Sequence, residues 1–140
     1  MNLLEIEDKA RGFNEARVLF VISRGAWDSP RLRNEALTGE NADKLMESAA
    51  LEFCGDAKNV EATKDSTTVT LSALFRWRTD DFESYGRVRG IANANLRDAI
   101  NLWRPKNAQL SINGDNVWHE FDWALNKQSA GTPANAGAQK

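Results

Sequence analysis

The sequence VTLSALFRWRTDDF, at residues 69–82, decides how the rest of the chain folds. It opens with the polar–apolar alternation of a β-strand. Leu74, Phe75 and Trp77 are then too closely spaced for that alternation, so the pattern predicts a change to helix. The pair Asp80-Asp81 stands just before a further helical pattern, where carboxylates often cap a helix N-terminus. We therefore expect this stretch to join a hairpin to a helix, with Trp77 in the core and Asp81 as a cap or an ion-pair partner.

Apolar residues at a spacing of three and four predict helices on both sides of this stretch. A short helix is expected at 3–10, where Leu3, Leu4 and Ile6 form an apolar stripe before Gly12. Two longer helices are expected at 41–54 and at 87–103. Pro105 prevents the last helix from continuing.

Several β-rich segments complete the expected fold. The apolar run in RVLFVIS, at 17–23, predicts a central strand that is buried on both faces. Segments 60–63 and 67–71 predict one hairpin, and segments 109–112 and 117–123, joined by an Asn-Gly turn, predict another. The expected class is α+β, with an antiparallel-rich sheet of about five strands packed by two main helices.

The chain is expected to form a single α+β domain over residues 1–126. The remaining residues, 127–140, read KQSAGTPANAGAQK and contain no large apolar side chain. Such a segment cannot bury enough surface to offset the entropy lost on ordering. We therefore expect a flexible polar tail.

Composition excludes several classes of function. A formal net charge of −2 gives no cationic excess for nucleic-acid binding. No apolar run approaches the length of a membrane span and no signal peptide is visible, so we expect no membrane insertion and, if the chain is full-length, a cytoplasmic location. A single cysteine, Cys54, rules out an intrachain disulfide and a cysteine-based metal cluster.

The motif residues Ser72, Trp77, Asp81 and Phe82, together with FDWALN at 121–126, carry a family resemblance. In the terminal block the matching positions are Asp122, Trp123 and Asn126. The chain resembles the C-terminal half of the uncharacterised family called domain of unknown function 547, over about residues 3–126. That family is distantly similar to transglutaminase and papain-like folds, in which a Cys, a His and an Asp cooperate.

The chain departs from this family at the positions that chemistry would need. The aromatic N-terminal half of the family's domain is missing, Leu19 occupies a position that often holds His, and Arg24 and Ser29 occupy the expected Cys positions. Only Asp122 of the catalytic set remains. The resemblance therefore implies a domain that has lost its catalytic residues.

Catalysis would have to use other residues. Cys54 or a serine (Ser23, Ser29 or Ser72) could pair with His119, the only histidine, and with Asp122. We regard Cys54 as a small buried residue and His119 as an ordinary strand residue, so no catalytic residue is predicted. No metal site and no cofactor are predicted either.

Binding candidates are aromatic and basic: Trp27, Arg24, Arg76, Arg78 and Trp118. Asp81 and Asp122 are possible partners of the arginines. The leading hypothesis is a non-catalytic interaction or structural module, a subunit of a larger assembly with a protein partner or a second copy of itself. The first alternative is a divergent cysteine or serine hydrolase or acyl-transferase of the papain or transglutaminase type. The second is an anion- or ligand-binding module that uses Arg24, Arg31, Arg76 and Arg78.

Overall fold

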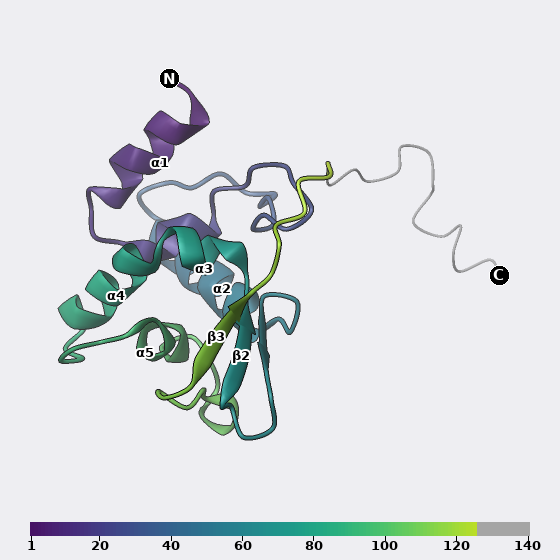
Figure 1. Ribbon diagram of the computed structural model, residues 1–140. Helices are drawn as coiled ribbons and strands as arrows, with labels where there is room; N and C mark the ends of the chain where they lie inside the picture. Colours follow the sequence, from purple (N-terminus) through teal and green to yellow (C-terminus); the bar gives the residue numbers. More distant parts are fainter. Residues whose placement is uncertain (126–140) are drawn as a thin grey trace, which may run out of the picture.

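A computed structural model describes residues 1–125. The predicted tail at 127–140 and the motif residue Asn126 therefore lie outside the described residues. The chain is of the α+β class, as expected, with helices gathered on one side of a small sheet (Figure 1). The elements in chain order are α1 (Leu3–Arg11), η1 (Ala16–Phe20), α2 (Ala42–Gly55), β1 (Val60–Ala62), β2 (Thr68–Leu71), α3 (Ala73–Trp77), α4 (Thr79–Val88), α5 (Leu96–Asn101), η2 (Lys106–Ala108) and β3 (Asp115–Trp118).

The sheet within the described residues has three strands in the order β1-β2-β3. The predicted hairpin at 60–63 and 67–71 is confirmed, because β1 and β2 pair antiparallel with Val60 opposite Leu71. β3 pairs parallel with β2, with Leu71 opposite Trp118. The prediction of about five strands in an antiparallel-rich sheet is therefore wrong. The sheet has one antiparallel pair and one parallel pair.

The prediction of a central strand at 17–23 is wrong in type, and only part of the segment is as buried as predicted. Residues Ala16–Phe20 form a 3-10 helix, in which Leu19 and Phe20 are almost completely buried. A short apolar run does not distinguish a buried strand from a buried helical turn by its periodicity. Here the run packs against α2 and α4, and none of the strands within residues 1–125 pairs with it. The Glu15 side chain accepts a hydrogen bond from the backbone N–H of Arg17 and begins the turn.

Phe20 is the centre of the hydrophobic core. Its ring lies 5.1 Å from that of Phe53 in α2, 5.5 Å from that of Phe82 in α4 and 5.4 Å from that of Trp103 beyond α5. Phe75 of α3 completes this group at 6.1 Å from Phe20. Edge-to-face and tilted packing of this kind adds stabilisation beyond the buried area. One 3-10 turn therefore packs against α2, α3, α4 and the turn that follows α5.

The predicted helix at 87–103 is interrupted. α4 ends at Val88, and the chain turns through Gly90 and Asn93, both at positive φ. A new helix, α5, then begins at Asn95, whose side chain accepts a hydrogen bond from the backbone N–H of Asp98. Asn95 is therefore the N-cap of α5, in a reciprocal capping box with Asp98.

The second predicted hairpin is also wrong. Residues 109–112 form no strand, and β3 begins at Asp115, inside the predicted turn. Gly114 has φ 132°, and a Cβ atom there would lie 2.1 Å from the carbonyl oxygen of Thr67. The Asn-Gly pair therefore serves close packing of β3 against the β1–β2 turn, rather than a hairpin of its own.

Candidate functional site

Two segments that are far apart in sequence pair at one end of the molecule. Ala26 forms an isolated antiparallel bridge with Leu125. The backbone N–H of Trp27 donates to the carbonyl oxygen of Ala124 at 2.7 Å, and that of Asp122 donates to the Asp28 carboxylate at 2.7 Å. This pairing fixes the course of residues 121–125 beside the loop at 26–28. It brings the terminal aromatic block next to α3.

Trp77, Phe121 and Trp123 form a second aromatic group outside the core, which we call the surface aromatic cluster. The Phe121 ring lies 4.9 Å from that of Trp77 and 4.5 Å from that of Trp123, and the two tryptophan rings are stacked at 5.8 Å. Trp123 is 61% exposed and Trp77 is 42% exposed. The prediction that Trp77 is a core residue is therefore wrong. Trp77 of the first sequence block therefore meets Phe121 and Trp123 of the terminal block at the surface.

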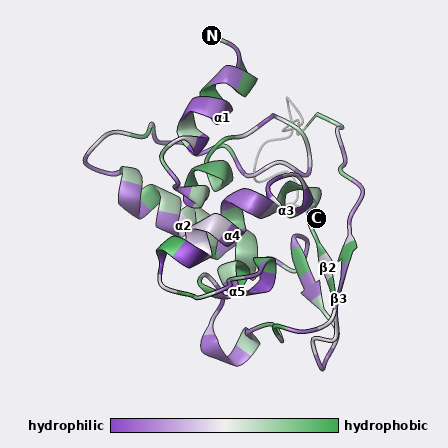
Figure 2. Cartoon of the chain, turned by 60° about the vertical axis from the view of Figure 1, so that its left-hand side comes forward, coloured by the Kyte–Doolittle hydropathy of each residue, from purple (hydrophilic) through white to green (hydrophobic). Residues whose placement is uncertain are grey.

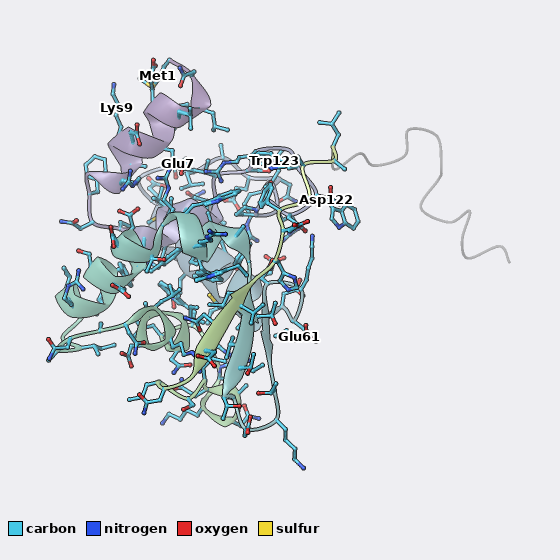
Figure 3. All side chains as sticks on the ribbon, viewed as in Figure 1. Met1, Glu7, Lys9, Glu61, Asp122 and Trp123 are labelled. Atoms are coloured by element: carbon cyan, nitrogen blue, oxygen red, sulfur yellow. The ribbon has the colours of Figure 1, made fainter. Side chains whose placement is uncertain are left out.

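A buried ion triad lies next to this cluster. The Glu7 carboxylate accepts hydrogen bonds from Arg78 Nε at 2.8 Å and from Arg24 Nη2 at 2.5 Å, and the Glu7 side chain is only 1% exposed. The Arg24 guanidinium also lies 5.8 Å from the centre of the Trp77 ring. Figure 3 places Glu7 on α1 and Trp123 at the same end of the molecule, away from Glu61 at the strands. Two guanidinium groups therefore share one carboxylate beside the aromatic rings.

Helix α1 does not pack against the rest of the chain through the apolar stripe that the sequence predicts. Leu3, Leu4 and Ile6 are 40%, 64% and 44% exposed, and Glu7 is the buried residue of the helix. Hydrophilic and hydrophobic residues both appear along α1 in Figure 2. Besides Glu7, Arg11 anchors the helix, because its Nε donates to the Asp81 carboxylate at 2.7 Å. Ion pairs rather than an apolar stripe therefore attach α1.

The motif acids and Ser72 have defined structural roles. Asp81 lies in the first turn of α4 and pairs with Arg11, so the ion-pair alternative holds, with a different arginine from those predicted. Ser72 is the N-cap of α3, where its Oγ accepts from the N–H of Leu74. Phe82 is a fully buried core residue. The Asp122 carboxylate accepts from the N–H of Ala124 and pairs with none of the predicted arginines.

Within residues 1–125, neither Cys54 nor Ser23, Ser29 or Ser72 makes a hydrogen bond to His119 or Asp122. Cys54 is completely buried at the end of α2, and this burial raises the pKa of its thiol. The His119 Nε2 atom is buried and has no hydrogen-bond partner in the part of the chain that the structure describes, whereas Asp122 is exposed. A thiol with a raised pKa is a poor nucleophile. The described residues also contain no group of three or more His, Cys, Asp or Glu side chains placed to hold a metal ion.

The binding candidates separate into different places. Arg24 and Arg78 meet at the ion triad, while Arg76 is exposed on α3. Trp118 is half-buried and packs against the core. Trp27 is 53% exposed, and the Lys58 ammonium lies 4.9 Å from its ring centre. Arg31 and Trp27 line the same cavity. The binding candidates therefore belong to two separate places, the ion triad around Glu7 and this cavity.

Glu7 and Phe121 are the site residues that sequence reasoning did not single out. Phe121 was noted only as part of the terminal block, although aromatic residues at alternate positions of one strand, here 121 and 123, share a face. Glu7 gave no local signal. It lies on a helix whose apolar residues suggested the opposite orientation, so only the tertiary structure reveals its contact with Arg24 and Arg78.

Comparisons with known proteins give no family for this chain: no protein-family model, no curated protein and no solved structure matches it. The resemblance to the domain of unknown function 547 family therefore stays an expectation. None of the helices described within residues 1–125 is both long and apolar enough to cross a membrane.

Proposed function

We propose that this chain is a non-catalytic interaction module, a subunit of a larger protein assembly, and that the surface aromatic cluster is its binding surface. The supporting observation is the packing of Trp77, Phe121 and Trp123 on one another outside the core, with the two tryptophans 42% and 61% exposed. Exposed apolar patches mark interaction sites, and tryptophan and arginine are the residues most enriched among binding hot spots. Arg24 beside Trp77 fits the same composition.

The cluster is held in place before any partner arrives. Trp77 ends α3, and the pairing of 26–28 with 122–125 fixes the segment that carries Phe121 and Trp123. A preorganised surface loses little conformational entropy on binding, so more of its contact energy contributes to affinity. The partner is a protein that presents an apolar or aromatic side chain to the rings, together with a hydrogen-bond acceptor for an indole N–H.

The test compares Trp123→Ser with Leu51→Ser, a substitution of a 49% exposed leucine on α2. Sedimentation velocity over a wide range of concentration measures self-association, and proximity crosslinking in extract measures other partners. We expect the Trp123→Ser variant to lose the complex and the Leu51→Ser variant to keep it. The proposal fails if the wild-type chain is monomeric at every concentration and its crosslinked proteins are unchanged in the Trp123→Ser variant.

The hydrolase alternative has less support. It requires an accessible nucleophile, whereas Cys54 is completely buried. Ser72 uses its Oγ to cap α3, and the Ser29 and Ser23 hydroxyl groups lie 3.0 Å from each other. An activity-based thiol or serine probe that labelled the folded chain at one of these residues would favour this alternative.

A further inference from the structure

A cavity of about 200 Å³ lies between the loop that carries Trp27 and helix α2, and it is lined by none of the residues of the surface aromatic cluster. Its apolar lining comes from Phe20, Ala49 and Phe53. Its polar lining includes Arg31, Arg33 and Lys58, opposed by Glu52 and Asp56. We call it the Trp27 cavity. An apolar floor with a few convergent polar groups is the usual form of a small-molecule site.

The arginine side chains that line this cavity have more hydrogen-bond donors than acceptors to bind them. Glu52 receives hydrogen bonds from Arg31 at 3.0 and 3.3 Å, and its other contact is an ion pair with Arg33 at 2.6 Å. The Arg33 side chain is 12% exposed, and its Nε–H is buried and has no hydrogen-bond partner among residues 1–125. A guanidinium group has five N–H donors, and a buried donor without an acceptor costs free energy. Arg33, which lines the cavity, therefore carries one donor that no group within residues 1–125 satisfies.

The acids around the cavity are already engaged. Asp56 accepts from the backbone N–H of Lys58, and Asp28 pairs with the Lys58 ammonium at 3.0 Å. Burial of Glu52 acts to raise its pKa, but the hydrogen bonds of Arg31 and the charge of Arg33 outweigh it, so the pKa of Glu52 is lowered. Glu52 thus stays ionised and holds both arginines in position at the cavity wall. A second carboxylate is the group that would complete this arrangement.

The volume of the Trp27 cavity and the residue at its rim indicate which group the ligand carries besides its carboxylate. A cavity of about 150 Å³ accommodates benzene, so about 200 Å³ leaves room for one ring and a carboxylate. Trp27, which is 53% exposed at the rim, offers a ring face for stacking. We propose that the Trp27 cavity binds a small planar monocarboxylate, with its carboxylate on Arg31 and Arg33 and its ring against Trp27 and the apolar floor.

Benzoate is the probe for this proposal. In ¹H–¹⁵N NMR spectra of the whole chain, Arg33 Nε–H and the Trp27 indole N–H each give their own signal. We expect benzoate to shift both signals along a saturable curve. Benzamide, which has the same shape without the charge, and acetate, which has no ring, should bind at least tenfold more weakly. Equal shifts with benzoate and benzamide, or shifts that do not saturate, would overturn the proposal.

Substitutions inside and outside the Trp27 cavity test whether benzoate binds there. Arg33→Lys keeps the charge but loses the planar fork, and Trp27→Ala removes the rim, so each should weaken benzoate binding at least tenfold. Trp123→Ser and Arg76→Lys lie outside the cavity and should leave benzoate binding unchanged, which also separates this site from the proposed interaction surface. If Arg33→Lys does not fold, Arg31→Gln decides, because Arg31 is 64% exposed and tolerates substitution. Unchanged benzoate binding in that variant would refute the assignment.

Discussion

Arg97 Nη2 donates a hydrogen bond to the carbonyl oxygen of Asp115 at 2.7 Å and so ties α5 to the start of β3. The same guanidinium reaches the loop before β3 and the turn of the β1–β2 hairpin through the carbonyl oxygens of Ser66, Ser111 and Asn113 at 2.7, 2.8 and 3.1 Å. Arg97 is 2% exposed. A single buried side chain therefore joins α5 to the β1–β2 turn, to the loop before β3 and to the start of β3.

Replacing Arg97 by Lys should destabilise the fold strongly. An ammonium group offers three donors around one point and cannot match the geometry of the guanidinium fork, so several buried carbonyl groups lose their partner. We expect a loss of about 3 kcal/mol or more in the free energy of unfolding, measured by urea denaturation. The exposed Arg76→Lys is the matched control and should change stability by less than about 0.5 kcal/mol. A loss below about 1 kcal/mol for Arg97→Lys would contradict this role.

Gly86 allows α4 to approach the turn before α5. A Cβ atom at this position would lie 2.8 Å from the Cβ of Ala94. Alanine is the better helix former by about 1 kcal/mol, but overpacking of this kind costs about 1–3 kcal/mol. We expect Gly86→Ala to lower the melting temperature, and Gly86→Ala combined with Ala94→Gly to recover part of the loss. The double variant should therefore lose less stability than the sum of the losses in the two single variants. Strict additivity would show that the two residues do not compete for space.

The Glu7 carboxylate should be essential for the attachment of α1. Glu7→Gln leaves two buried guanidinium groups without a counter-charge, which typically costs about 3–5 kcal/mol. We expect the α1 amides to exchange their hydrogens faster than the core amides in this variant. Lys9→Gln is the control, because Lys9 is exposed and extends away from the body in Figure 3. Unchanged exchange in α1 would mean that Arg11 and Asp81 alone hold the helix.

Acid should destabilise the attachment of η1 to α2. Burial acts to raise the pKa of Glu15, but hydrogen bonds from Arg17 outweigh it, so the folded-state pKa is below its usual value of 4.5. Arg17 also donates to Asp43 at 2.8 Å and to Glu47 at 2.9 Å. A lowered folded-state pKa gives stability that is present above the unfolded pKa and is lost as the pH falls through the folded one.

The measurement is the urea midpoint as a function of pH. We expect it to fall below about pH 4.5 and to fall less steeply in Glu15→Gln. The dependence should not vanish in that variant, because the pKa values of Glu52 and Asp65 are lowered too. Parallel curves for the two chains would exclude a contribution from Glu15.

Local patterns predicted those elements whose partners are near in sequence. The α2 helix and the β1–β2 hairpin follow from periodicity and from turn residues. The parallel pairing of β3 with β2 could not be read locally, because it depends on Gly114 packing against Thr67 and on Arg97 holding both. The prediction of a strand at 17–23 was wrong for a related reason. The apolar sequence indicates burial, but it does not indicate which elements lie beside the segment.

The sequence identified several residues of the candidate site, but not how they pack together. Both aromatic blocks were visible in the sequence, but whether Trp77 is core or surface depends on what covers it. Trp77 ends the short helix α3, and its ring meets residues 121–123 instead of the core. The Trp27 cavity depends on Arg33 and Lys58, which carry no motif and acquire their meaning only from their neighbours.

The pairing of 26–28 with 122–125 has a consequence for the chain during its synthesis. The core around Phe20 can collapse once α5 and Trp103 have left the ribosome, because all of its aromatic residues precede that point. Trp77, in contrast, has neither of its ring partners until residues 121–123 emerge. The surface aromatic cluster, the proposed binding surface, is therefore completed only after all the aromatic residues of the Phe20 core have been synthesised.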